Sequence, residues 1–272
     1  KKARGDLRSY SPERILQQIK FSNVQGCKEF WLTSQDTFCY GFDRKTNLPD
    51  LLQLITTNIR GDYFVRVGMG NPLHLKKYYP DLIEAYESDH IYKFLHIPVQ
   101  SGSNSVLKDM QRGHTAEDYI SIVSAFRERF PEIQVWTDII VGFPTESEED
   151  FLASCELIEK SKPDFVNVSK FGARPSTRAS RMKQLPNEVV KERSRKISQL
   201  VDETAIKQNK KWLGWRGLAL VSEFNKDKGN FIGRNFAYKP IVIKDSDGLK
   251  LGDAVEVEIA DAGRVLFGEV CS

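Results

Sequence analysis

At 272 residues, with 40% hydrophobic and 28% charged side chains, the chain has the composition of a globular protein with room for one large domain and a small one. No run approaches the roughly 18 apolar residues that span a bilayer, and no secretory hydrophobic segment opens the chain, so we expect neither. The four cysteines (Cys27, Cys39, Cys155 and Cys271) include no C-x-x-C pair. Their spacing argues against a zinc knuckle or a disulfide framework and favours a reducing compartment such as the cytoplasm.

The net charge of +3 is unevenly distributed along the chain. Residues 170–216 carry 13 Lys and Arg against four Asp and Glu, whereas residues 1–169 carry 20 against 24 and residues 217–272 seven against nine. Such a basic block is often a solvated helix face, and the alternative is a groove for a polyanion such as RNA. Charge alone leaves both interpretations open.

The first two thirds of the chain alternate between strand and helix patterns. Ser11 followed by Pro12 is typical of a helix start and predicts a helix to about Asn23. Further helices are predicted from residue 48 and over 79–88, 116–130, 147–161 and 187–211, with strands over 28–33, 63–67, 93–99, 134–141 and 164–171. This alternation predicts a parallel α/β sheet or a partial barrel.

From Trp215 the pattern changes to short strands separated by turns that carry Gly and Asp. Strands are predicted over 216–221, 231–234, 239–243, 255–259 and 265–270. This spacing predicts a small all-β domain, a five-stranded barrel of the kind that holds nucleic acids. We place the two domains at 1–211 and 212–272.

Four loops that follow predicted strands are rich in groups that can hold a polar ligand. Because the carboxyl ends of parallel strands meet at one end of a sheet or barrel, we expect these loops to converge. Each loop taken alone could simply cap the next helix, but four in succession favour a binding site, and Gly142 beside Phe143 offers close backbone approach for a flat ring such as adenine. The groups are, in chain order, Ser34, Gln35, Asp36, Arg66, Asn71, Gln100, Ser101, Ser103, Gly142, Phe143 and Pro144, followed by Arg174.

The familiar catalytic motifs are missing from the sequence. It has no G-x-S-x-G, no H-E-x-x-H, no Walker A motif and no G-x-G-x-x-G. The four histidines are scattered, and His96, in an apolar strand, is interpreted as a core histidine rather than a base. Binding groups without an obvious acid, base or nucleophile indicate that a cofactor carries the chemistry.

Several longer motifs resemble one known family, the radical S-adenosylmethionine methylthiotransferases. The barrel part of the resemblance lies in His96–Ser103, Arg112–Gly113, Thr137–Pro144 and Arg174–Ala179. Leu32–Thr37, ending in Tyr40–Gly41, is most similar to the branch that modifies threonylcarbamoyladenosine in transfer RNA. The end of the chain resembles the small RNA-binding TRAM domain of that family, through Gly229–Arg234, Tyr238–Pro240 and Leu251–Asp253.

The resemblance implies a partial (β/α)6 barrel that binds S-adenosylmethionine across its strand ends, followed by the TRAM barrel. It further implies a [4Fe-4S] cluster held by a C-x3-C-x2-C loop, a second cluster in an N-terminal domain, and an electron donor protein. On the positions that match, Ser34, Gln35 and Asp36 would meet the methionyl amino group, Gln100 and Ser101 the ribose, and Ile140, Gly142 and Phe143 the adenine. Arg66 and Pro144 complete the predicted cofactor-binding set.

The chain departs from the family in its cysteines, since it contains no C-x3-C-x2-C. Lys1 stands where that motif would just have ended. We therefore expect the first barrel strand, the cluster loop and the N-terminal cluster domain to be missing, with the cluster cysteines upstream of Lys1. This chain alone is then expected to ligate no cluster and to be inactive.

The intact enzyme would convert N6-threonylcarbamoyladenosine, next to the anticodon, to its 2-methylthio form, with S-adenosylmethionine as methyl donor and radical source. The anticodon stem-loop would be held by phosphate contacts that weaken with salt. The residues predicted to make them are Arg174, Arg178, Arg181, Lys210, Lys211, Arg234 and Lys239.

Three alternatives stay open on the sequence. The first keeps the chemistry and changes the substrate to isopentenyladenosine in transfer RNA or to an aspartate of a ribosomal protein. The second is a non-catalytic RNA-binding module that has lost its cluster. The third is a sugar- or nucleotide-binding α/β protein with an unrelated β-barrel, which the continuous motif matches across both domains disfavour.

Overall fold

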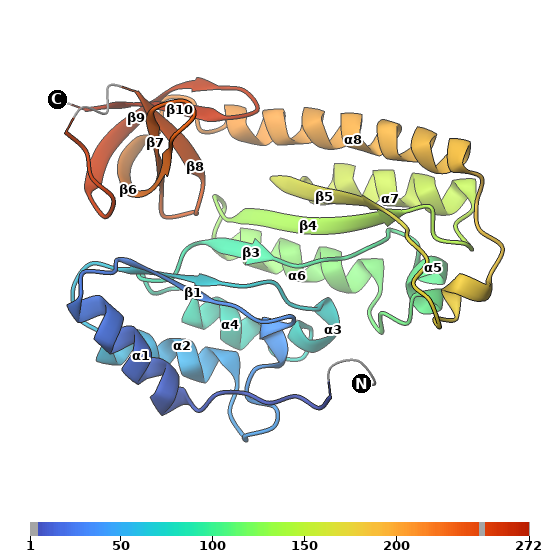
Figure 1. Cartoon of the computed structure of the whole chain (residues 1–272), viewed down its shortest axis with the longest axis horizontal. Helices are drawn as coiled ribbons and strands as arrows, with labels where there is room; N and C mark the ends of the chain where they lie inside the picture. Colours follow the sequence, from blue (N-terminus) through green and yellow to red (C-terminus); the bar gives the residue numbers. More distant parts are fainter. Residues whose placement is uncertain (1–4, 245–247, 272) are drawn as a thin grey trace.

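Five parallel strands carry the first part of the chain in the computed structural model, which describes residues 5–244 and 248–271 (Figure 1). One sheet pairs β1 (Glu29–Leu32) with β2 (Phe64–Val67). The other has the order β3 (Phe94–His96), β4 (Gln134–Val141), β5 (Phe165–Lys170). An isolated parallel bridge between Val65 and Ile91 joins the two. The strands therefore follow one another in chain order, as the alternation of strand and helix predicts.

The helices between these strands form a continuous outer layer. Each long helix contacts the next along the chain (α1 with α2, α2 with α4, α4 with α6, α6 with α7, and α7 with α8). Their ends are locally encoded, because Ser11 caps the first and Thr115 and Ser147 form capping boxes at two others. The helices are α1 (Pro12–Val24), α2 (Leu48–Asn58), α3 (Pro72–Leu75), α4 (Tyr79–Ala85), α5 (Asn104–Asp109), α6 (Ala116–Arg129), α7 (Glu148–Ser161) and α8 (Asn187–Lys210), with short 3-10 turns η1 (Thr37–Cys39) and η2 (Ala179–Arg181).

Side-chain alternation along β4 separates the core from an inner face. Val135, Thr137, Ile139 and Val141 are buried, whereas Trp136, Asp138 and Ile140 are only partly buried. Val135, Ile139 and Val141 belong to the large core that the helices cover, and Thr137 is buried on the same side. Since successive side chains of a strand point to opposite faces, Trp136, Asp138 and Ile140 mark three levels of the inner face, from the amino end to the carboxyl end of the strands.

The last part of the chain forms a closed five-stranded barrel, in the order β10-β8-β7-β6-β9 (Figure 1). Its own apolar cluster includes Trp212, Ile241 and Val257. The predicted all-β barrel is thus present, while the proposed boundary between residues 211 and 212 stays a prediction. The strands are β6 (Arg216–Asn225), β7 (Asn230–Arg234), β8 (Pro240–Lys244), β9 (Ala254–Ala262) and β10 (Leu266–Val270).

A turn of this barrel, residues 235–239, docks on the amino ends of the parallel strands. The Lys93 backbone N–H donates to the Phe236 carbonyl at 2.8 Å. Tyr238 places its ring 5.0 Å from the rings of Tyr92 and Phe94, measured between centroids. The Lys239 ammonium lies 2.8 Å from the carboxylate of Asp164, and both side chains are buried. This barrel turn therefore closes the amino end of the inner face.

No helix in the described ranges is long and apolar enough to cross a membrane.

Candidate functional site

A cavity of about 730 Å³ opens at the carboxyl ends of the parallel strands. Its volume lies within the range that proteins use for small-molecule ligands. Loops that follow β1, β2, β3 and β5 contribute to it, together with β4 itself, so the expected convergence of strand-end loops is present. Its lining is Gln35, Asp36, Met69, Gly70, Asn71, Pro98, Gln100, Arg112, His114, Asp138, Ile140, Asn167, Ser169, Lys170, Phe171, Gly172, Arg174, Thr177 and Ala179.

Asp138 provides a fixed negative charge on the inner face of the cavity. One carboxylate oxygen accepts from the Asn167 amide at 2.8 Å, and the other lies 3.4 Å from Nε2 of His96. Burial alone would raise the pKa of Asp138, but the hydrogen bonds from His96 and Asn167 and the nearby Arg112 charge outweigh it and hold that pKa below its usual value. His96 therefore pairs with a carboxylate on the inner face instead of lying in the apolar core, which corrects the sequence interpretation.

Arg112 and His114 enter the cavity from the loop after α5. Burial lowers the pKa of Arg112, and the charge of Asp138 acts in the opposite direction. Within the described part of the chain, the buried Nε of Arg112 has no hydrogen-bond partner. Burial also lowers the pKa of His114, whose Nε2 lies 3.1 Å from the Val99 carbonyl oxygen. His114 is thus a neutral wall residue near pH 7, whereas Arg112 is a partly buried cation.

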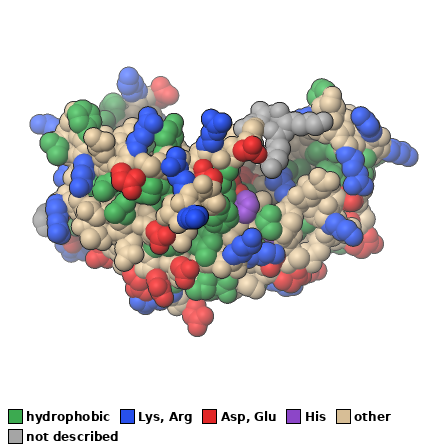
Figure 2. All heavy atoms as spheres, turned by 90° about the horizontal axis from the view of Figure 1, so that it is seen from below, with side chains coloured by type: hydrophobic (Ala, Val, Ile, Leu, Met, Phe, Trp, Pro, Cys, Tyr) green, Lys and Arg blue, Asp and Glu red, His purple; other side chains and the backbone are tan. Residues whose placement is uncertain are grey.

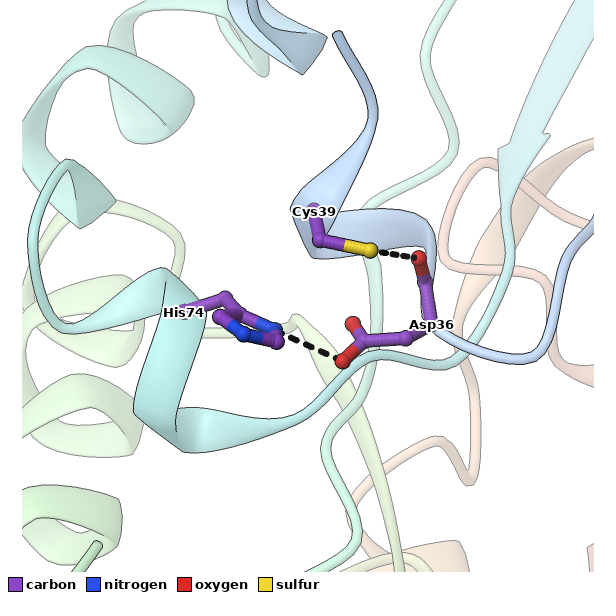
Figure 3. Close-up of side chains that lie close together, drawn as sticks. All are labelled: Asp36, Cys39 and His74. Carbon is purple, nitrogen blue, oxygen red and sulfur yellow. Dashed lines mark hydrogen bonds and ion pairs between the residues drawn. The ribbon is translucent and has the colours of Figure 1, made fainter. Parts of the chain in front are cut away.

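Asp36, on the loop after β1, is held by His74 on α3 (Figure 3) and by Asn71 on the loop after β2. Nδ1 of His74 lies 2.7 Å from one carboxylate oxygen, and the Asn71 backbone N–H donates to the other at 3.0 Å. The Cys39 thiol donates to the Asp36 carbonyl at 3.1 Å. Burial, with the charge of Asp36 adding to it, raises the pKa of Cys39 to about 11. The thiol is therefore protonated at neutral pH, and internal hydrogen bonds account for the grouping of Asp36, Cys39 and His74.

Gln100 reaches the cavity through an unusual backbone conformation. Its φ is +78°, in the region that side chains other than glycine rarely adopt. Two backbone hydrogen bonds to β4 hold it, because its N–H donates to the Asp138 backbone carbonyl at 2.8 Å and its carbonyl accepts from the Ile140 N–H at 2.9 Å. Such a conformation costs on the order of 1–3 kcal/mol and persists where the surroundings over-determine it. The strain directs one amide side chain into the cavity.

The loop after β4 packs outward against α8. A Cβ on Gly142, whose φ is +81°, would lie 2.7 Å from a methyl group of Val190. Glu146 accepts from the Gly142 N–H at 3.1 Å and forms a buried ion pair with Arg193 at 2.6 Å. Burial raises the pKa of Glu146, although the bonds from Gly142 and Arg193 oppose this effect. The close approach that the glycine permits is therefore to α8, and this loop supports the cavity from outside.

The family model described as the Radical SAM superfamily matches residues 1–158, more than half of the chain. The chain belongs to the radical SAM superfamily. Its fold is a partial radical SAM barrel followed by a small closed all-β barrel.

Curated relatives are similar to this chain over nearly its whole length. A probable threonylcarbamoyladenosine tRNA methylthiotransferase of Pyrococcus horikoshii is 46% identical over 269 residues, which are 98% of this chain and 62% of that protein. The threonylcarbamoyladenosine tRNA methylthiotransferase of Drosophila melanogaster is 36% identical over 99% of this chain and 49% of its own length. The human enzyme of the same name is 35% identical over 97% of this chain and 45% of its own length. The chain thus spans between about half and two thirds of these relatives.

Among solved structures, coproporphyrinogen III oxidase (HemN) from Escherichia coli, a radical SAM enzyme, aligns with a TM-score of 0.47 and 16% identity, over 77% of this chain and 48% of HemN.

Radical SAM proteins use S-adenosylmethionine and a [4Fe-4S] cluster, and the residues present fit the two groups differently. The cavity offers the amide of the strained Gln100, the fixed carboxylate of Asp36 and the apolar side chain of Ile140, which suit the polar and flat parts of S-adenosylmethionine. The four cysteines are free. The metal-ligand grouping found among the described residues contains one of them, Cys39. A cysteine-ligated cluster therefore does not fit these residues.

The structure separates the residues predicted to bind the cofactor. Gln35, Asp36, Gln100 and Ile140 line the cavity together. Ser34 lines a second cavity of about 420 Å³ beside α1, and Asp36 borders both. The residues outside the cavity lining are Arg66, Ser101, Gly142, Phe143 and Pro144.

Two of these outlying residues have clear structural partners. Ser101 is buried and accepts from the Ser103 N–H at 3.1 Å. The Arg66 guanidinium lies 4.9 Å from the ring centroid of Phe94 and 5.0 Å from that of Tyr238, toward the amino end of the strands. The cofactor contacts proposed for all of these residues stay predictions.

The residues predicted to bind RNA also fall into two groups. Arg174, Arg178, Arg181, Lys210 and Lys211 are exposed. Lys239, in contrast, is 2% exposed, and its ammonium bonds to Asp164 and Asn209.

Arg234 is partly buried, and its guanidinium lies 4.2 Å from the Tyr238 ring centroid, within the barrel part of the chain. The face on the side of α1 and α2, by comparison, intermixes acidic and basic side chains (Figure 2). The exposed basic residues of the connecting segment thus keep their proposed RNA role, and Arg234 stays a prediction as well, whereas Lys239 bonds to Asp164 and Asn209 in the first part of the chain.

Sequence reasoning missed several polar residues of the cavity, among them Arg112, Asp138, Asn167 and Lys170. Strand alternation could have found two of them, because Asp138 shares a face with Ile140, and Asn167 shares one with Ser169.

Proposed function

We propose that this chain is the radical SAM and RNA-binding part of an enzyme that converts N6-threonylcarbamoyladenosine in transfer RNA to its 2-methylthio derivative. The observation that carries the proposal is 46% identity over 98% of the chain to an archaeal relative with that name, continuous through the parallel strands and the barrel. The polar cavity at the carboxyl ends supports it, because barrel enzymes place their chemistry at that end.

In this proposal the chain's own residues bind and orient the reactants. Asp36, held by His74 and Asn71, presents a carboxylate to the amino group of S-adenosylmethionine, and Gln100 donates to its ribose. S-adenosylmethionine, when bound, supplies the radical chemistry of the superfamily. Asp138 and Asn167 hydrogen-bond to one another on the inner face and offer polar contacts to the adenosine that enters from the mouth.

The anticodon stem-loop would approach over the exposed basic residues between β5 and the barrel. Arg174, Arg178 and Arg181 follow β5, and Lys210 and Lys211 end α8. Lys and Arg neutralise phosphates and release counterions, so binding should weaken steeply with salt. The proposal further includes two [4Fe-4S] clusters and an electron donor protein, which act in the cytoplasm with parts of the enzyme other than these residues.

The test is nucleoside mass spectrometry of transfer RNA from cells that lack the full-length gene. We expect 2-methylthio-N6-threonylcarbamoyladenosine to disappear and its unmethylthiolated precursor to accumulate, and the full-length gene to restore the product. An unchanged level of the product would contradict the proposed function. Loss of the 2-methylthio form of isopentenyladenosine, or of a methylthio group on a ribosomal protein, would move the substrate to one of the alternative branches.

A further inference from the structure

The cavity at the carboxyl ends carries more positive charge than its own carboxylates neutralise. Its lining contains the cations Arg112, Lys170 and Arg174 and the carboxylates Asp36 and Asp138. Both carboxylates already have polar partners within the chain, Asp36 in His74 and the Asn71 N–H, and Asp138 in Asn167 and His96. Across residues 5–244 and 248–271, none of the three cations lies within 4 Å of a carboxylate as an ion pair. A cavity with this balance favours a ligand that brings negative charge.

The three cations lie at two depths. Arg112 is partly buried and interacts electrostatically with Asp138 on the inner face. Lys170, the last residue of β5, and Arg174, four residues later, are exposed at the mouth. The Arg174 carbonyl accepts from the Oγ1 of Thr177 at 2.7 Å and from its N–H at 3.3 Å. This closed turn fixes the backbone from which the Arg174 side chain extends.

Two anionic groups would enter this cavity in the proposed reaction. S-adenosylmethionine carries the carboxylate of its methionyl part, and N6-threonylcarbamoyladenosine carries the carboxylate of its threonyl part. In the proposed function the cofactor would be held by Gln100, near the inner cation Arg112, whereas the nucleoside would arrive on an RNA from outside. The inner cation therefore matches the cofactor, and the pair at the mouth matches the substrate.

Resting on the function proposed above, we propose that Lys170 and Arg174 bind the threonyl carboxylate of N6-threonylcarbamoyladenosine and thereby select this substrate over adenosines with neutral N6 groups. Arg174 offers a planar fork of donors that matches a carboxylate in two hydrogen bonds, and Lys170, which lines the same cavity, adds a point charge. Ser169 and Asn167, on the same face of β5, supply hydrogen-bonding groups for the polar carbamoyl linkage. An isopentenyl group would leave both cations without a partner.

The experiment measures binding of anticodon stem-loops to the full-length protein at constant salt, with three stem-loops that differ only in the modified base. One carries N6-threonylcarbamoyladenosine, one carries its methyl ester, which removes the negative charge, and one carries unmodified adenosine. We expect wild-type protein to bind the acid at least about tenfold more tightly than the ester, a ratio that one charge-assisted contact supplies. The double variant Lys170→Gln/Arg174→Gln should lose this ratio.

Matched variants separate carboxylate recognition from general attraction to RNA. Lys183→Gln removes an exposed cation from the same connecting segment, outside the cavity lining, and should weaken all three stem-loops equally. Arg174→Lys keeps the charge and should retain part of the ratio between acid and ester. The affinity of the double variant for S-adenosylmethionine should equal that of wild type, which also shows that the variant is folded.

Three results would overturn the inference. They are equal binding of acid and ester by wild type, an unchanged ratio in a double variant that keeps its S-adenosylmethionine affinity, and an unchanged ratio in a double variant that loses that affinity. The last result would assign the two cations to the cofactor, and the second would leave them as contacts to RNA phosphates. Failure of the proposed function is seen separately, as an unchanged level of the methylthiolated nucleoside in cells that lack the gene.

Discussion

The two ends of the parallel strands are built from the same strands and differ in nearly every physical property. At the amino end, the rings of Phe94, Trp136 and Tyr238 pack together under a turn of the β-barrel. At the carboxyl end, loops surround an open polar cavity lined by three cations and two carboxylates. The change takes place within a few residues, since Trp136 and Asp138 are neighbours on the same face of β4. One end therefore stabilises the molecule, and the other is free to bind ligands.

The largest loss of stability is expected when the buried ion pair at the amino end of the strands is disrupted. Asp164→Ala leaves the Lys239 ammonium buried without its carboxylate, so we expect a loss of about 3–5 kcal/mol in the free energy of unfolding. Chemical denaturation followed by circular dichroism measures this loss. Glu256→Ala, which removes the exposed partner of Arg216, is the control and should cost less than about 1 kcal/mol. Equal effects of the two variants would show that the amino end is not a structural junction.

A second test concerns the outside of the cavity wall. Gly142→Ala places a Cβ 2.7 Å from a Val190 methyl group, at a φ of +81°, and should destabilise the protein by about 1–3 kcal/mol. Val190→Ala in the same chain removes the steric clash and should restore part of the loss, while the backbone strain persists. The coupling is read from a double-mutant cycle of unfolding free energies. Additive effects would contradict the packing of this loop on α8.

The smallest expected effect lies inside the cavity, at Asp138. Its pKa is lowered in the folded protein, so its ionised form stabilises the fold at neutral pH. This contribution is lost as the pH falls below its unfolded value near 3.8 and through the lower folded value. Asp138→Asn should therefore cost about 1 kcal/mol at pH 7, and the difference from wild type should narrow between pH 5 and pH 3. A constant difference in unfolding free energy across that range would mean that the charge of Asp138 does not stabilise the fold.

Local sequence signals predict most of the elements, because the decisive residues lie within one turn of each other. Ser11, Thr115 and Ser147 cap helices that begin where the sequence places them. The short helices α3 and α5 were missed, since four and six residues give no apolar period. At the site, the strand-end loops converge as expected, but contacts between distant segments decide which side chains enter the cavity.

Two residues show why sequence alone could not complete the site. Gly142 suggested close approach to a ligand, which stays a prediction, and the structure adds a close approach to Val190 on α8, 48 positions away. Lys239 suggested an RNA contact, and its partner Asp164 lies 75 positions earlier in the chain. The residue type indicates that Lys239 has a polar partner and that something lies close to Gly142. Which residue this is depends on tertiary packing and cannot be predicted from the local sequence.

The docked turn that carries Tyr238 and Lys239 has a consequence for how the two parts can be separated. A cut between residues 211 and 212 would expose Tyr238 and Lys239, which are 3% and 2% exposed in the whole protein. The isolated barrel would therefore expose an aromatic side chain and an unpaired cation that promote nonspecific binding. A measurement of its affinity for RNA would include the contribution of this newly exposed surface. Transplanting the barrel onto another protein would first require replacing Tyr238 and Lys239 by side chains that tolerate water.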